Sequence, residues 1–103
     1  MLRIVRHRKA KRDILRIYCY LGERNMDAAE RFVRAVNDDL RRLAAMPNIG
    51  ALRESTNPNL KGVRSLPVTG FRNYLIFYRV TSTELQVLRV IHGAQDIDTV
   101  FDE

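Results

Sequence analysis

The repeat distance of apolar residues changes once along this chain of 103 residues, and this change most constrains its fold. Before residue 46, apolar side chains recur at every third or fourth position, a spacing typical of amphipathic helices. After residue 63 they form short dense runs rich in β-branched and aromatic residues, which are typical of strands. Helices followed by strands predict an α+β domain in which the helices cover one face of a sheet.

Two helices are expected in the first half of the chain. The first has helical periodicity from Arg8 to Arg24 and contains Cys19, which we expect to be a small buried side chain. The second begins at Asp27, with Glu30 three residues later as in a capping box, and it ends before Pro47. Because few residues link the two helices, they should form an antiparallel helical hairpin.

The strands complete the order β-α-α-β-β-β, with the helical hairpin packed on a small, mainly antiparallel sheet. One short strand is expected at residues 2–5, and three more within residues 63–92 should form a three-stranded antiparallel sheet. We therefore expect a single domain over residues 1–103. It divides into a strand plus helical hairpin at 1–46, a loop at 47–62, the sheet, and an acidic tail at 93–103 that is a short helix or extended.

The central strand of this sheet is expected at residues 74–80, YLIFYRV, because this run is apolar on both faces. Pairing it with the strand that returns after the turn places Phe77 opposite Val87 and Leu75 opposite Arg89. Phe77 and Val87 then share one face. Both faces are apolar enough to be at least partly covered.

Charge is distributed unevenly along the chain, which carries a net +6 and has a pI near 10.1. Residues 1–25 carry net +6, whereas residues 81–103 carry net −4. Basic residues gather at the start of the first expected helix, where cations oppose the helix dipole and so do not serve helix stability. These are Arg6, Arg8, Lys9, Lys11 and Arg12. The pattern favours an acidic protein or a nucleic acid as a partner.

Several classes of protein are excluded by the same sequence. The longest apolar run, Tyr74 to Tyr78, is far shorter than the roughly 20 residues of a membrane-spanning helix. A single cysteine permits no internal disulfide and no cysteine-based zinc site, and the two histidines lie far apart. We expect a cytoplasmic protein with no cofactor, no metal and no membrane contact.

Three phrases in the strand region are typical of one protein family. They are SLPV (Ser65 to Val68), YLIFYRV (Tyr74 to Val80) and LRVIHGAQDI (Leu88 to Ile97). With the element order, they make the chain resemble the RelE/ParE superfamily of bacterial type II toxins, and more narrowly its ParE-like branch. The resemblance implies the RelE/ParE-like toxin fold. It also implies neutralisation by a small antitoxin encoded alongside, usually acidic in the segment that wraps the toxin.

The superfamily has two activities, and the residues of this chain favour one of them. RelE-like toxins cut messenger RNA on the ribosome, whereas ParE-like toxins poison DNA gyrase. Cutting RNA needs a base, a cation and an acid, which RelE-like toxins supply from lysines, arginines and a tyrosine. Here the strand at residues 63–68 has no lysine, Leu75 and Gln95 stand in place of arginines, and Phe101 stands in place of the tyrosine. We therefore expect a ParE-like toxin that acts by binding gyrase, with no catalytic residue.

Two alternatives stay open. One is a RelE-like, ribosome-dependent mRNA endoribonuclease with a variant active site, in which His92 is the base and Arg64 and Arg89 contact phosphate. Against it, His92 beside Gly93 is more simply explained as a cap on the last strand. The other is a degenerate toxin that only binds its antitoxin.

Candidate contact residues follow from this interpretation. For the target, the cationic candidates of the strand region are Arg64, Arg72, Arg79, Arg89 and His92. For a ParD-like antitoxin, an amphipathic helix on apolar positions is a common mode of binding. Some of five apolar helix residues are expected to serve this contact, whereas most of them should belong to the intramolecular core. The five are Leu15, Tyr18, Leu21, Phe32 and Val36. We expect a hetero-oligomeric complex that reaches operator DNA only through the antitoxin.

Overall fold

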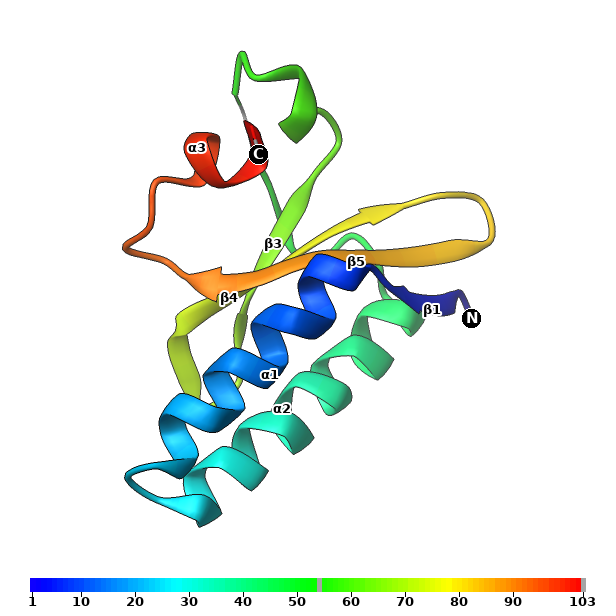
Figure 1. Cartoon of the computed structure of the whole chain (residues 1–103). Helices are drawn as coiled ribbons and strands as arrows, with labels where there is room; N and C mark the ends of the chain where they lie inside the picture. Colours follow the sequence, from blue (N-terminus) through cyan, green and yellow to red (C-terminus); the bar gives the residue numbers. More distant parts are fainter. Residues whose placement is uncertain (54, 103) are drawn as a thin grey trace.

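A five-stranded sheet in the order β1-β5-β4-β3-β2 separates two long helices from a shorter third helix (Figure 1). The computed structural model describes residues 1–53 and 55–102. Glu54 of the expected loop and Glu103 of the expected acidic tail lie outside the described residues. The elements are β1 (Arg3–Arg6), α1 (Arg8–Gly22), α2 (Met26–Ala45), β2 (Ala51–Leu52), the 3₁₀ turn η1 (Pro58–Leu60), β3 (Arg64–Val68), β4 (Phe71–Val80), β5 (Glu84–His92) and α3 (Ile97–Asp102).

The α+β prediction is confirmed, and the sheet is larger than the three strands expected. β1 pairs in parallel with β5, while the other neighbouring strands pair antiparallel. The short β2 strand, within the expected loop, pairs with Ser65 and Arg64 of β3. β4 lies at the centre of the sheet, as its continuous apolar run predicts.

The register expected between β4 and β5 is wrong. Phe77 lies opposite Arg89 instead of Val87, and Leu75 lies opposite Ile91. A bulge between Phe77 and Tyr78 places one extra residue in β5 at this point, and an extra residue reverses the side-chain alternation beyond it. Val87 therefore packs on the helix side of the sheet, away from Phe77.

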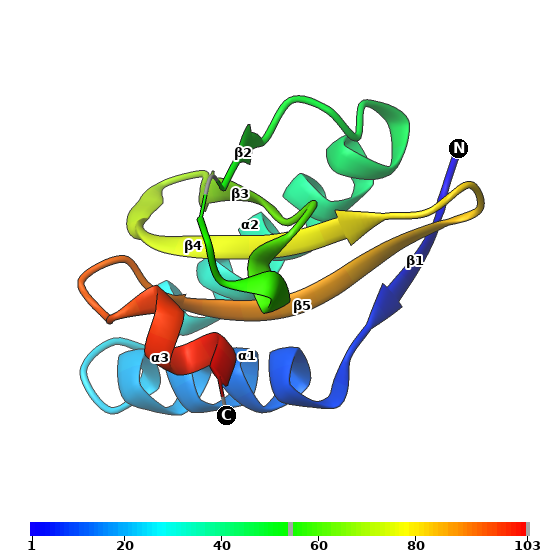
Figure 2. The ribbon, with the colours of Figure 1, turned by 90° about the horizontal axis from the view of Figure 1, so that it is seen from above.

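Two separate apolar clusters cover the two faces of the sheet. Figure 2 shows α2 behind β4 and β5 and α3 in front of them. The larger cluster, between the helical hairpin and the sheet, is Ala10, Ile17, Phe32, Val36, Leu40, Leu43, Val68, Ile76, Tyr78, Leu85, Val87 and Val90. The smaller one, on the opposite face, is Leu60, Val63, Phe77, Leu88 and Ile91, and residues of α3 pack against it. The expectation that both faces are covered is confirmed. We call the face under α3 the outer face.

Two local expectations in the helical hairpin are wrong. Asn25, not Asp27, caps α2, because its side chain accepts a hydrogen bond from the amide of Ala28 at 3.2 Å. Asp27 instead pairs with Arg31 one turn along α2. Cys19 is exposed. The buried side of α1 includes Ile17, and Cys19, two residues further on, lies about 200° around the helix from it.

The phenol of Tyr78 fixes the loop that follows α2. Its hydroxyl donates to the carbonyl oxygen of Pro47 at 2.7 Å and accepts from the amide of Gly50 at 2.9 Å. A Cβ on Gly50 would lie 2.3 Å from that hydroxyl oxygen, so only glycine fits beside the ring. The side chain of Tyr78 is fully buried, which makes this loop part of the core.

Alkaline pH should destabilise the protein through Tyr78. Burial raises the pKa of Tyr78 above its ordinary value of 10.0, and the amide of Gly50 only partly offsets this. The neutral phenol is thus favoured in the folded state, so its contribution is complete below about pH 10 and is lost as the pH rises through the folded pKa. Urea unfolding at a series of pH values should show a steeper alkaline loss of stability for the wild type than for Tyr78→Phe.

The matched control for that measurement is Tyr74→Phe. Burial also raises the pKa of Tyr74, but Tyr74 is only half-buried, and its variant keeps the Tyr78 phenol. The Tyr74→Phe protein should therefore retain most of the alkaline loss. Equal slopes for the wild type and Tyr78→Phe would contradict the assignment.

Candidate functional site

Two of the predicted target-binding arginines hold the loop between α2 and β3 in place. Arg64, at the start of β3, donates from Nη1 to the carbonyl of Gly50 at 2.8 Å. Arg79, near the end of β4, donates from Nη2 to the carbonyls of Asn59 and Lys61, both at 3.3 Å. Each guanidinium has five N–H donors, so these bonds orient the group and leave further donors for a ligand.

Arg89 forms a buried ion pair with an aspartate of α1 that is not among the predicted site residues. Asp13 is 1% exposed and accepts from Nε of Arg89 at 2.7 Å and from its Nη2 at 3.0 Å. It also accepts from the amide of Val90 at 3.0 Å and from Arg16 at 2.6 Å. The buried residues of α1 are Ala10, Asp13 and Ile17, which are three and four positions apart. This helical spacing is the sequence feature that could have predicted a buried Asp13.

Arg72 and His92 lie at the exposed margin of the sheet. Arg72 is exposed in β4, rather than in the turn before it. His92 ends β5, where its Nδ1 accepts from the amide of Ala94 at 3.1 Å. Its ring packs in a T-shaped arrangement with the ring of Tyr74, with the two centroids 5.3 Å apart. These contacts are those of a residue that caps a strand.

The three residues of the variant ribonuclease site do not converge. His92 pairs with Tyr74 of β4, whereas Arg64 pairs with Tyr78, four residues further along that strand. Four strand residues span about 13 Å, and Arg64 lies on the opposite side of β4 from His92. Arg89 forms an ion pair with Asp13. Within residues 1–53 and 55–102 no group of three His, Cys, Asp or Glu side chains could hold a metal ion.

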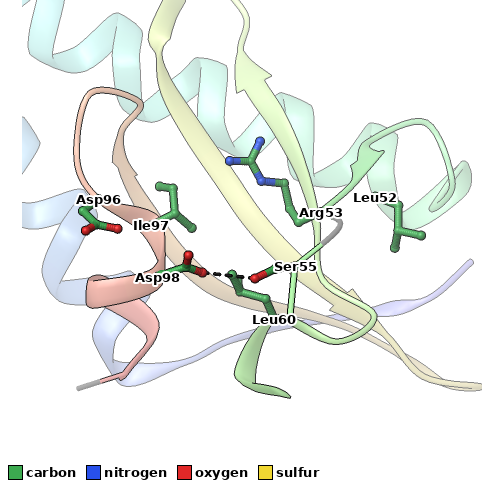
Figure 3. A pocket seen from close by; sticks show the side chains of 7 residues that line it. All are labelled: Leu52, Arg53, Ser55, Leu60, Asp96, Ile97 and Asp98. Carbon is green, nitrogen blue, oxygen red and sulfur yellow. Dashed lines mark hydrogen bonds between the residues drawn. The ribbon is translucent and has the colours of Figure 1, made fainter. Parts of the chain in front are cut away.

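A cleft of about 280 Å³ lies between the loop after β2 and the start of α3 (Figure 3). Ser55 donates to Asp98 across it at 3.2 Å, and Asp96 lies on the same side as Asp98. Arg53 extends from the other wall, with its guanidinium 5.3 Å from the ring centroid of Phe77. Because acids and a cation oppose one another here, this cleft lacks the single sign of charge that would select an ion.

A second cleft, which we call the basic cleft, has a volume of about 270 Å³ and opens between the start of α1 and the outer face. Arg79 and Arg89, two of the predicted target-binding residues, both line it. Lys9 and His7 line it from the N-terminal side, and Phe101 contributes an apolar wall. The fold thus brings residues from the two ends of the chain together with cations of the sheet.

The five predicted antitoxin contacts divide into exposed and buried residues. Leu15 is 63% exposed on α1, and Tyr18 and Leu21 are half-buried on the same helix. Phe32 and Val36 of α2 are 0% and 1% exposed. These two residues belong to the core of the free toxin, as expected for most of the five candidates. The accessible candidates are therefore on α1.

Comparison with known proteins agrees with this architecture. The family model described as "ParE toxin of type II toxin-antitoxin system, parDE" matches residues 4–97. Toxin ParE1 from two strains of Mycobacterium tuberculosis is 32% identical over 81 residues, which cover 78% of this chain and 76% of that protein. The solved structure described as the chromosomal ParDE TA system from P. aeruginosa has a TM-score of 0.72 and 28% identity. It covers 89% of this chain and 96% of that chain.

No helix within the described residues combines the length and the apolar character needed to cross a bilayer. The family model spans nearly all of the chain, including β1, the helical hairpin and the three long strands. The narrower of the two resemblances seen in the sequence is therefore confirmed. The chain belongs to the ParE toxin family of type II toxin-antitoxin systems.

Proposed function

We propose that this protein is the toxin of a type II toxin-antitoxin pair, and that it acts in the cytoplasm by binding DNA gyrase without catalysing a reaction of its own. The match of the ParE family model over residues 4–97 carries the proposal. General acid–base chemistry needs groups within hydrogen-bond reach of one substrate. His92, Arg64 and Arg89 do not converge in this way, which supports action by binding.

A ParD-like antitoxin is the proposed partner, because the structural relative is described as a ParDE system. The accessible apolar residues of α1, Leu15 with Tyr18 and Leu21, suit an amphipathic partner helix. An acidic wrapping segment of the antitoxin would complement the net charge of +6. The complex would be hetero-oligomeric and would reach operator DNA through the antitoxin.

Gyrase supercoiling and a ribosome-programmed messenger RNA cleavage assay, run on the same toxin preparation, test the target. The expected result is inhibited supercoiling, accumulated cleaved-DNA complexes and intact RNA. Cleaved RNA that disappears with His92→Ala would establish the ribonuclease alternative instead. Normal supercoiling and intact RNA at a large excess of folded toxin, with antitoxin binding retained, would contradict gyrase inhibition and support the degenerate toxin that only binds its antitoxin.

Within that assay, Arg72→Gln should weaken gyrase inhibition about tenfold. Arg72 is exposed, and no other side chain within the described residues engages its guanidinium, so a charge-assisted bond to the target would be lost without damage to the fold. The matched control is Arg34→Gln, which removes the same charge from the exposed face of α2. The role of Arg72 fails if both variants inhibit gyrase as well as the wild type does.

A further inference from the structure

The carboxylate of Asp39 reaches from α2 to the turn between β3 and β4. It is 3% exposed, and it accepts from the amide of Thr69 at 2.8 Å and from the hydroxyl of Thr69 at 2.8 Å. The guanidinium of Arg42, one turn further along α2, lies 3.7 Å from it and compensates its charge. A buried carboxylate is stable only where it is paired and hydrogen-bonded, so these bonds fix Thr69 relative to α2.

The segment that follows this turn departs from regular strand pairing, and we call residues 69–73 the hairpin tip. The register of β3 against β4 shifts between Pro67 and Val68, which leaves residues 72–74 of β4 as a bulge. Gly70, within the turn, has a φ of +81°, a conformation that favours glycine. Bulges redirect side chains and are common next to functional sites. The tip therefore has the local geometry of a recognition element.

Arg72 lies in this bulge between two anchored residues. The ring of Phe71 packs in a T-shaped arrangement with the ring of Phe32, with the two centroids 5.3 Å apart. The carbonyl of Asn73 accepts from the amide of Gly93 at 2.7 Å. The side chain of Arg72 between them is exposed. The backbone of Arg72 is thus held on both sides, while its guanidinium is accessible to a partner.

We propose that Asp39 is a positioning residue, which holds the hairpin tip through Thr69 so that Arg72 meets an acidic group of gyrase in a preset orientation. This inference rests on the proposed function and adds a residue that does not itself touch the target. Loops and side chains lose conformational freedom when they bind, and a tip that is anchored in advance has less of it to lose. A guanidinium in a fixed orientation can also use its paired donors on a carboxylate.

Gyrase supercoiling tests the proposal with four toxins: the wild type, Thr69→Val, Arg72→Gln and the double variant. Thr69→Val removes the hydroxyl that Asp39 holds, at an exposed position, and should weaken inhibition about fivefold. With Arg72→Gln, which alone weakens inhibition about tenfold, the same change should have almost no further effect, because the hydroxyl acts through Arg72. A purely structural role would lower inhibition equally in both backgrounds, to about fiftyfold in the double variant. Thr69→Ser keeps the hydroxyl and should inhibit gyrase as well as the wild type does.

Thr81→Val is the matched control, because the hydroxyl oxygen of Thr81 accepts from the amide of Glu84 at 3.0 Å and so holds the turn between β4 and β5. The two turns lie at opposite ends of the sheet (Figure 1). Thr81→Val should inhibit gyrase as well as the wild type does. Unchanged inhibition by Thr69→Val, equal losses from Thr69→Val and Thr81→Val, or additive losses in the double variant would each overturn the positioning role alone. Normal supercoiling with the wild-type toxin would instead overturn the proposed function, and the positioning role with it.

Discussion

Asp13→Ala should lower the free energy of unfolding by about 3–5 kcal/mol, the usual result of removing one partner of a buried ion pair. The carboxylate is 1% exposed, and the Arg89 side chain is 12% exposed. Without Asp13 the guanidinium keeps its charge with little water to solvate it. The amide of Val90 also loses its acceptor, which adds to the penalty.

Urea unfolding followed by circular dichroism measures this effect. Asp13→Asn keeps the shape but removes the charge, so it should also destabilise the protein. Asp38→Asn is the control on α2: its partner Arg41 and Asp38 itself are both exposed, and such surface pairs contribute about 0–1 kcal/mol. A loss below about 1 kcal/mol for Asp13→Ala would show that the pair is solvated in the folded protein.

Phe32→Ala should lower the stability of the toxin, whereas Leu15→Ala should leave stability nearly unchanged and weaken antitoxin binding. Phe32 is fully buried, with its ring 5.3 Å from that of Phe71 and 5.4 Å from that of Tyr74, so its truncation should cost about 3–5 kcal/mol. Leu15 is 63% exposed, so its truncation should change the stability of the free toxin by no more than about 0.5 kcal/mol.

For antitoxin binding, the variant with the large expected effect is Leu15→Ala. If α1 is the partner surface, Leu15→Ala should weaken the complex about tenfold or more, the loss usual for an apolar anchor at an interface. Isothermal titration of each folded variant with the cognate antitoxin provides the measurement. An unchanged dissociation constant for Leu15→Ala would move the antitoxin surface away from this part of α1.

The helices and the central strand could be predicted because each depends on a repeat within a few residues. The spacing of Ile14, Ile17 and Leu21 marks α1, and the continuous run of residues 74–80 marks β4. The register of β4 against β5 could not be predicted in the same way. It depends on a bulge at Phe77, which one extra residue creates without any distinctive local pattern.

The candidate surfaces show the same division between local and long-range information. The sequence identified the cations of the strand region and the cluster at the start of the first helix, but it did not place them together. Lys9 and Arg79 are 70 positions apart and line one cleft because α1 packs along β5 next to β4. Leu15 and Phe32 were likewise both candidates as apolar residues of the two helices, and only burial distinguished them.

By itself, the sequence determined the order of elements, the pairing of two helices and the membership of a toxin family, because apolar period and short strand phrases are local properties. Only the tertiary structure decided which charges meet and which apolar residues remain accessible. Asp13 illustrates the reason: a carboxylate on a helix is stable in the interior only where a cation and an amide from a distant strand reach it. Those partners are 76 and 77 positions away, beyond the reach of any local pattern.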